Sequence, residues 1–540
     1  MQGFIILDGY VDEPSCLGVP PYISPYPRYI AGALIDAGAE WRYITIDQYR
    51  NGISIPAFQT MVIICGGIVP GKYLRGMPAS PHEVEKIVSS FPGRCYIAGP
   101  GGRFWKRRIS DAEVIVNDAD AFLYDLVRTG AGNDRRRTLN EWERWAELGA
   151  CVIRDHPDFP EPLIAEIEMM RSCVRYFMGG CSFCTDVLYG EPVFRGEASV
   201  VREVQRMRAL GLERFRLGGI SCTFTYRAKG IGETETPKPN PDAWRRILTG
   251  VCTPDQPKVL HTDNANPAVM SAHPAEATRI LKMLIEYCTP GNILSLGMES
   301  ADEAVIRANR LNATPEDVMR SIRMINRVGQ CIGKNGMPYL LPGLNFLTGL
   351  DGESRETFRK NLEFLRRVMD EGLLLRRINI REVAPWRKVF RPGFRVEARR
   401  FRETVRKEID HQMIKKVVPA GRVLHDVYLE CIIGNVTFGR QIGTYPILIG
   451  IPGKLAINRF ITVVVTSHGE RSITGLEYPI RVNTLPLSSL SEIPGLGRKG
   501  AATLVRRRPF KSLDQMLTIL KGMESAEPAY TILSTGSTLD

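Results

Sequence analysis

Three cysteines lie close together in the chain, at a spacing typical of ligands to a metal cluster. Cys173 is followed by seven residues and then by Cys181, and two residues separate Cys181 from Cys184. A Cys-x-x-Cys pair lets two thiolates reach one metal centre from a short turn. Gly179 and Gly180 precede the pair and allow the backbone to bend sharply there. Three thiolates would leave one iron of a four-iron cubane open to a substrate group.

Two other kinds of site would use some of these cysteines. A structural zinc ion normally takes four ligands, and no fourth Cys or His stands beside the three in the sequence. A thioredoxin-like redox pair needs only Cys181 and Cys184, and it leaves Cys173 without a role. We favour a cluster with one open iron because it uses all three cysteines.

The segments that must position this loop alternate between strand and helix over residues 161–386. Helical patterns such as 316–329 and 355–372 lie between most of the strands. Six strand–helix units predict a partial or full (β/α) barrel of the TIM type, with its chemistry at the C-terminal ends of the strands. The candidate strands are IAEIEMM, RFRLGGI, KVLHTD, ILSLGME, LNFLTGL and RINIREV.

These motifs, in this order, resemble the radical SAM superfamily, whose members hold a [4Fe-4S] cluster on three cysteines usually spaced C-x3-C-x2-C. The first gap here is seven residues, a departure that some branches tolerate. Residues 217–219 (LGG) resemble the glycine strand that binds the methionine amino group, and LGMES at 296–300 resembles the strand whose acid faces the ribose. Residues 341–354 and 378–386 resemble the fifth and sixth strands. The resemblance implies that Cys173, Cys181 and Cys184 are the cluster ligands and the catalytic residues. It also implies six candidates for cofactor binding: Gly218, Gly219, Ser221, Glu299, Ser300 and Asn345.

The resemblance also implies the chemistry. The open iron would chelate the amino and carboxylate groups of S-adenosylmethionine (SAM). One electron, from a donor such as ferredoxin, would cleave the sulfur–carbon bond. The resulting 5′-deoxyadenosyl radical would abstract hydrogen from an unreactive carbon. The cofactors supply this step, and the protein positions and shields them.

Residues 1–110 show a second strand–helix alternation, which predicts a Rossmann-like domain with a parallel sheet. Residues 19–40 resemble the start of the cobalamin-binding domains in one radical SAM branch. The Asp-x-His-x-x-Gly motif of those domains is absent, and His82 and His156 stand in other contexts. A cobalamin site and a domain without a cofactor therefore both stay open.

Cys16, Cys65 and Cys95 allow another interpretation. Radical SAM methylthiotransferases carry three N-terminal cysteines that hold a second cluster, and Cys65 follows a strand as in that family. Cys16 and Cys95 stand in different contexts, so we favour buried thiols at all three positions. No signal-peptide pattern opens the chain, and we expect a cytoplasmic protein in which its twelve cysteines form no disulfide framework.

The remaining segments complete the expected layout. Residues 111–160, polar and basic, are interpreted as a connector, and residues 387–420 as a helical linker. Residues 421–482 resemble a TRAM domain, the small β-barrel of RNA-modifying enzymes. Residues 483–523 resemble a helix-hairpin-helix, and residues 524–540 look like a loose tail.

The helix-hairpin-helix predicts contacts with nucleic-acid phosphates. Gly495 and Gly497 would form the hairpin, and backbone N–H groups at such a turn and helix start bind phosphate. Arg498, Lys499 and Arg506 add positive charge. The net charge of +12 also favours an anionic partner, of which nucleic acid is the commonest. A hairpin that only packs is the alternative.

The whole order resembles an archaeal group of radical SAM proteins with a C-terminal helix-hairpin-helix, and also the layout of tRNA methylthiotransferases. We therefore expect an enzyme that methylates or otherwise functionalises a carbon of an RNA nucleoside, with tRNA as the first candidate. Three alternatives stay open: methylthiolation with a second cluster, a nucleic-acid-binding protein with a structural cluster, and radical chemistry on a small molecule or a protein. No run of eighteen apolar residues occurs, so we expect no membrane partner, and the oligomeric state stays open.

Overall fold

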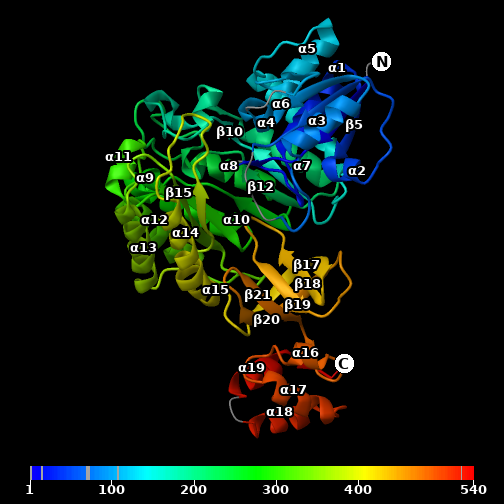
Figure 1. Cartoon of the computed structure of the whole chain (residues 1–540), viewed down its shortest axis with the longest axis vertical. Coiled ribbons are helices and arrows are strands. Elements are labelled where there is room, and N and C mark those ends of the chain that lie inside the picture. Colours follow the sequence, from blue (N-terminus) through cyan, green and yellow to red (C-terminus); the bar gives the residue numbers. More distant parts are fainter. Residues whose placement is uncertain (1–2, 14–15, 68–72, 106–108, 524–525, 540) are drawn as a thin grey trace. The chain divides into compact units, whose positions relative to one another are not determined.

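The structure, a computed structural model, describes residues 3–13, 16–67, 73–105, 109–523 and 526–539. The chain divides into two compact units (Figure 1). The first comprises Met1–Cys288 and Ala384–Val389, and the second comprises Thr289–Val383 and Phe390–Asp540. Among the helices of the described residues, none is long and apolar enough to cross a membrane.

The first unit begins with a five-stranded sheet in which all neighbouring strands are parallel. The second long strand of the chain pairs with one edge of the first, and the third pairs with its other edge. A topological switch point therefore lies beside the first strand, β1. This confirms the Rossmann-like N-terminal region. The strand order is β5 (Glu40–Thr45), β1 (Gly3–Asp8), β6 (Thr60–Ile64), β7 (Arg94–Ala98) and β8 (Ala112–Val114).

The structure differs from the expected connector at 111–160. Strand β8 completes the N-terminal sheet, and α5 (Ala119–Thr129) and α6 (Leu139–Leu148) pack against α1 (Pro25–Ala37). Helix α5 buries Phe122, Leu123 and Leu126, and α6 buries Trp142 and Trp145. Charged residues are numerous over 111–160 as a whole, which is why the segment resembles a connector in the sequence.

The cysteine loop follows one strand of a second parallel sheet in the first unit. Its order is β13 (Val259–Thr262), β12 (Arg214–Gly218), β9 (Ile164–Glu168) and β4 (Tyr22–Ile23). Helices α7 (Glu197–Ala209), α8 (Pro241–Val251) and α10 (Pro274–Tyr287) follow its strands. The carboxyl ends of β9 and β12 therefore lie side by side, where a parallel sheet usually places its ligands.

The second unit contains a three-stranded parallel sheet, in the order β14 (Asn292–Glu299), β15 (Leu340–Thr348) and β16 (Ile378–Glu382). Helices α12 (Pro315–Gly329) and α13 (Arg355–Asp370) follow β14 and β15. All six strands predicted over 161–386 are present, and they belong to two parallel sheets. The barrel that would unite them stays a prediction.

A small closed barrel follows in the second unit and confirms the predicted β-barrel (orange in Figure 1). Helices α14 (Arg395–Thr404) and α15 (His411–Val417) precede it. Its core is made largely of aliphatic side chains, such as those of Leu424, Ile449 and Val463. The barrel order is β17 (Val423–Ile433), β18 (Val436–Gln441), β19 (Leu448–Pro452), β21 (Ser472–Glu477) and β20 (Phe460–His468).

The C-terminal helices are α16 (Leu487–Leu490), α17 (Gly497–Arg506), α18 (Leu513–Lys521) and α19 (Glu527–Gly536). Helix α19 stands where a loose tail was expected, because its Ala529, Ile532 and Leu533 are buried in the core of this module. The next residues, β23 (Ser537–Thr538), pair with β22 (Ile480–Arg481). Residues 524, 525 and 540 of the expected tail lie outside the described residues.

Candidate cluster and cofactor site

The loop with the three cysteines, residues 173–184, is here named the cluster loop. Cys173 precedes the short helix η2 (Val174–Met178), which ends at Gly179. Gly179 and Gly180 have φ angles of 77° and 60°, the left-handed region that favours glycine. The Cys184 N–H donates a hydrogen bond to the Cys181 carbonyl oxygen at 3.2 Å. The glycines thus supply the sharp bend predicted for this loop.

The pKa values of the thiols in the cluster loop depend on burial and on one another's charge. Burial raises the pKa of Cys173 and of Cys184, and the charges of Asp186, Cys181 and Cys173 raise the pKa of Cys184 further. Binding to iron would deprotonate them, because a cysteine ligates a metal as thiolate. Among the described residues, no three Cys, His, Asp or Glu side chains are arranged as ligands of a single metal ion.

Two arginines that the sequence reasoning missed hold the cluster loop. Arg175 Nη1 donates to Cys181 Sγ at 2.9 Å, and its Nη2 donates to Glu235 at 3.1 Å. Arg387 donates to the carbonyl oxygens of Gly179, at 2.7 Å, and of Cys181. A basic residue inside a cysteine loop is a sequence signal that could have identified Arg175. The sequence around Arg387 holds no sign of this contact, which depends on the fold.

The predicted glycines Gly218 and Gly219 lie at the end of β12, against β9. A Cβ on Gly218 would lie 1.8 Å from Glu166 Oε1, and a Cβ on Gly219 would lie 2.6 Å from Glu168 Cα. Gly219 has a φ of 50°, and its N–H donates to Glu166 Oε1 at 3.0 Å. Packing between the two strands therefore requires these glycines, in addition to any role in binding a ligand.

Ser221 lies beside Cys173 of the cluster loop, and its role as a cofactor ligand stays a prediction. Its hydroxyl is hydrogen-bonded to Cys173 and lowers the pKa of that thiol. Gly219 and Ser221 line a cavity of about 70 Å³ together with Ser172 and Asp186. Small-molecule sites typically measure about 300–1,000 Å³. A ligand as large as a nucleoside thus requires lining side chains to move.

The other predicted cofactor residues lie in the second unit. Glu299 ends β14 at a bulge, with a φ of 60° that is uncommon for a residue with a side chain. Burial raises its pKa to about 8, and the charge of Arg381 acts in the opposite direction. Asn345 accepts a hydrogen bond from Asn379 Nδ2 at 3.3 Å. Ser300 is buried and accepts a hydrogen bond from the Asp302 N–H at 3.1 Å, which orders the start of the following helix.

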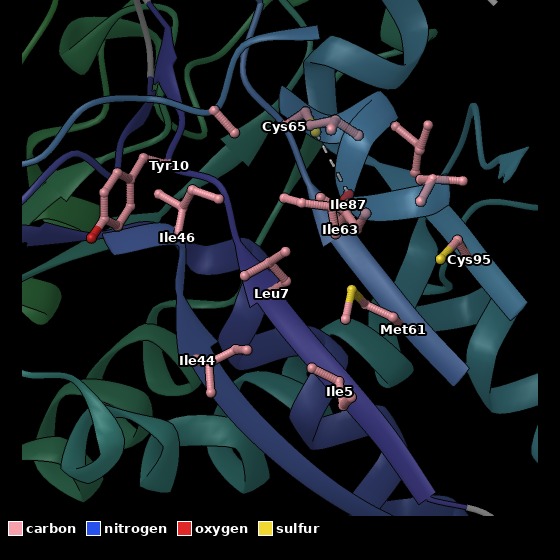
Figure 2. Close-up of a cluster of buried hydrophobic side chains, with 14 of the residues drawn as sticks. Ile5, Leu7, Tyr10, Ile44, Ile46, Met61, Ile63, Cys65, Ile87 and Cys95 are labelled. Carbon is pink, nitrogen blue, oxygen red and sulfur yellow. Dashed lines mark hydrogen bonds between the residues drawn. The ribbon is translucent and has the colours of Figure 1, made fainter. Parts of the chain in front are cut away.

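The N-terminal cysteines do not converge on one site. Cys95 pairs in register with Met61, whereas Cys65 stands just after Ile64, so the two lie about 13 Å apart along the strands. Both are buried in the apolar cluster of the N-terminal sheet (Figure 2). Cys16 lines the cavity beside the cluster loop instead. This arrangement supports buried thiols and speaks against a second cluster on these three residues.

The two histidines considered as cobalt ligands, His82 and His156, stand outside the strands of the N-terminal sheet. His82 is exposed on α3 (Pro81–Ser90), and His156 is buried, where its Nδ1 accepts a hydrogen bond from the Asp158 N–H. Trp386 lies against Gly67 and stacks on Phe104 with ring centroids 4.9 Å apart. Residues 68–70, which follow β6, lie outside the described residues.

The predicted phosphate contacts lie at the start of α17. Gly495 and Gly497 have φ angles of 80° and 57°, and no side chain caps the helix start. Uncapped N–H groups of a first helical turn can donate to an anion. Both glycines are exposed, as are Arg498, Lys499 and Arg506.

One solved structure with detectable similarity is the radical S-adenosylmethionine methyltransferase TsrM from Kitasatospora setae, with cobalamin and a [4Fe-4S] cluster bound. The TM-score is 0.47 at 12% sequence identity, and the match covers 70% of this chain and 75% of that chain.

Sequence comparison gives closer relatives, although no family model matches the chain. An uncharacterized protein of Methanocaldococcus jannaschii is 42% identical over 502 residues, which cover 87% of this chain and 92% of the relative. An uncharacterized protein of Archaeoglobus fulgidus is 40% identical over 545 residues, which cover 96% of this chain and 98% of the relative. The chain therefore belongs to the family of these two archaeal proteins.

Proposed function

We propose that this protein is a radical SAM enzyme whose [4Fe-4S] cluster is held by Cys173, Cys181 and Cys184. The observation that carries the proposal is the cluster loop itself. Its three thiols lie on one glycine-bent loop, and one of them, Cys173, interacts with Ser221, which follows the end of β12. When bound, the cluster and SAM supply one-electron cleavage of a sulfur–carbon bond and hydrogen-atom abstraction.

The residues of the chain bind and orient this centre. Arg175 donates to the Cys181 sulfur, which favours the thiolate that iron requires. Arg387 fixes two carbonyl oxygens of the cluster loop and so keeps Cys181 in place. Cys173, Cys181 and Cys184 are half-buried, so the fold of the loop shields the centre from water in part.

Anaerobic reconstitution with iron and sulfide tests the proposal. We expect about four irons per chain, and, after reduction by dithionite, conversion of SAM into methionine and 5′-deoxyadenosine, measured by mass spectrometry. Cys181→Ser and Cys184→Ser should lose both the iron and the cleavage. Cys151→Ser, a half-buried thiol outside the cluster loop, is the matched control. Full iron loading without any cleavage of SAM would indicate a structural cluster.

The finer proposal is that the substrate is RNA, with tRNA first, and that a carbon of one nucleoside is methylated or otherwise functionalised. The exposed glycine turn and the cations of α17 support it, together with the small barrel. Cobalamin stays a prediction of the resemblance, and ferredoxin is the expected class of electron donor.

Nucleoside mass spectrometry of total RNA from a strain that lacks the protein tests the substrate. Loss of the mass of one methylene from a tRNA nucleoside would support methylation. Loss of a thiomethyl substituent would instead support methylthiolation. If every nucleoside is unchanged, RNA modification is wrong, and a small molecule or a protein becomes the substrate to seek.

A further inference from the structure

Two guanidinium groups lie over the ring of Tyr189, which ends the short helix η3 (Asp186–Tyr189) just after the cluster loop, and a third, that of Arg171, belongs to the same cavity lining as Tyr189. Arg103 Cζ lies 4.7 Å from the centroid of the Tyr189 ring, and Arg136 Cζ lies 5.4 Å from it. Arg171 and Tyr189 both line the cavity that adjoins the cluster loop. We name Arg103, Arg136 and Arg171 the arginine cluster.

Each member of the arginine cluster has a buried nitrogen that lacks a hydrogen-bond partner within the described part of the chain. These atoms are Arg103 Nη1, Arg136 Nη1 and Arg171 Nη2. Arg171 is only 7% exposed, and its Nη1 pairs with Asp118 at 2.8 Å. Buried donors are almost always paired. Three unpaired guanidinium donors in one place therefore indicate that a ligand supplies their acceptors.

The acids around the arginine cluster already have partners, including Glu168, which lines the same cavity and pairs with Arg137 at 2.7 Å. Burial lowers the pKa of Arg136, and the positive charges of Arg171 and Arg103 lower it further, while Asp118 acts in the opposite direction. Asp118 already accepts hydrogen bonds from Arg171 and from the Arg137 N–H.

Two other acids act on Tyr189, namely Glu13 and Asp186. Glu13 accepts a hydrogen bond from the Gly67 N–H. Neither carboxylate is an acceptor for the unpaired nitrogens of the arginine cluster.

We propose that the arginine cluster binds a phosphate group of the substrate, beside the cavity at the cluster loop. Guanidinium groups are planar and permanently charged, and they match the oxygens of phosphate with paired hydrogen bonds. The inference deepens the proposed function, since every nucleotide of an RNA substrate carries such a group. It rests on the proposed function only for the identity of the substrate.

Calorimetric titration of the full-length reconstituted protein tests the site. The probes are inorganic phosphate, adenosine 5′-monophosphate and adenosine, and we expect the monophosphate to bind and adenosine to bind at least about tenfold more weakly. Arg136→Gln, at a half-buried side chain, should weaken monophosphate binding by about tenfold or more. Arg136→Lys keeps the positive charge but loses the planar set of N–H donors, so it should restore only part of the affinity. Arg245→Gln, an exposed arginine of α8, is the matched control and should bind as the unmodified protein does.

Further measurements distinguish the possible sources of the phosphate and show whether the variants are folded. Hydroxocobalamin also carries a phosphodiester, and its competition with inorganic phosphate would assign the site to a corrinoid phosphate. Arg103→Gln should reproduce the effect of Arg136→Gln, and unchanged unfolding midpoints would show that both variants fold. Equal binding of the monophosphate to the unmodified protein and to both variants would overturn the proposal. So would an Arg136→Gln variant that loses affinity for SAM but not for phosphate, since the site would then serve the SAM carboxylate. SAM cleavage is measured separately, so failure of the phosphate site and failure of the radical SAM assignment remain distinguishable.

Discussion

The hydrogen bond from Arg175 to the Cys181 sulfur has a consequence that can be measured. Hydrogen bonds to cluster sulfurs are among the factors that set the reduction potential of an iron–sulfur centre, because they stabilise its negative charge. Arg175→Gln should therefore lower the potential by tens of millivolts, on the order expected for one charged donor. A redox titration followed by electron paramagnetic resonance measures this shift.

The exposed Arg245 again provides the control, since Arg245→Gln should leave the potential unchanged. Iron content must be equal in both variants, so that loss of the cluster is not mistaken for a shift. An unchanged potential in fully loaded Arg175→Gln would show that the contact with Cys181 only orders the loop.

Asp8 at the end of β1 makes the stability of the first unit depend on pH. Its carboxyl accepts hydrogen bonds from the Tyr10 N–H and the Tyr43 hydroxyl, both at 3.0 Å. Burial nonetheless raises its pKa from the ordinary 3.8 to about 7. Between these values the folded state holds a proton that the unfolded state has lost, so stability falls as pH rises. The loss begins near pH 4, is nearly complete above pH 7, and is on the order of a few kcal/mol.

Asp8→Asn should remove this dependence, because the amide has the same shape and stays neutral. Thermal unfolding midpoints at pH 5 and pH 8 provide the measurement. The midpoint of the unmodified protein should fall relative to the variant between these values. Asp111→Asn, at an exposed position, should follow the unmodified protein. Parallel pH profiles for the unmodified protein and Asp8→Asn would mean that Asp8 is ionised in the folded state.

At the scale of single elements, the end of β12 is fixed by its contact with β9. A methyl group on Gly218 would lie 1.8 Å from Glu166 Oε1, and Glu166 is itself held by a buried ion pair with Arg216 at 2.5 Å. The carboxylate cannot move away without breaking that pair. Gly218→Ala should therefore destabilise the protein by at least about 2 kcal/mol.

The unfolding midpoint measures this effect, and the chain offers a matched control. A Cβ on Gly393 would meet no atom within 4 Å, so Gly393→Ala should be nearly neutral. An equal midpoint for Gly218→Ala and the unmodified protein would mean that β9 shifts easily. Binding of a ligand would then be the main reason for glycine at this position.

Helix α17 is the element on which the RNA proposal depends. Arg498 and Lys499 stand in its exposed first turn, beside N–H groups that no side chain caps. Reversing both charges with Arg498→Glu and Lys499→Glu should weaken tRNA binding by about tenfold or more and reduce its salt dependence, since fewer counterions are released. Filter binding at several salt concentrations measures both quantities.

Lys521→Glu, at the end of α18, is a control with the same type of charge reversal at an exposed position. Equal tRNA affinity for the double variant and for this control would show that α17 is a packing hairpin. The radical SAM proposal would be unaffected by that result.

Elements with a strong local sequence pattern were predicted, and elements with a weak one were missed. The six strands over residues 161–386 are short apolar runs between turns, and all six are present. Helices α5 and α6 were missed because the many charges of the whole segment 111–160 outweighed the apolar residues of the two helices in our interpretation. The arginine pattern at 135–137 was interpreted as part of a connector, yet Arg137 is buried between Asp120 and Glu168. Arg387 could not be predicted at all, since its contacts with the cluster loop arise only from the fold.

At the scale of the second unit, the C-terminal helices and the small barrel share one core. Val464 and Leu476 of the barrel belong to the same buried cluster as Ile532 and Leu533 of α19. The pairing of β23 with β22 joins the same two parts. A module that shares its core with a neighbour does not fold as an independent body, because removing either part exposes apolar surface on the other.

Leu533→Ala tests whether the two parts fold together. The side chain is fully buried, so its truncation should cost about 2–5 kcal/mol. Hydrogen exchange followed by mass spectrometry should then show faster exchange both in α17–α19 and in β20 and β21. Thr531→Ala, exposed on the same helix, should leave both regions unchanged. Faster exchange confined to the helices would mean that the barrel is stable alone and that the helices form a separable module. Because the shared cluster reaches into β20 through Val464, we expect the disturbance to pass from the C-terminal helices into the barrel, so that the proposed RNA contacts on α17 depend on the integrity of both.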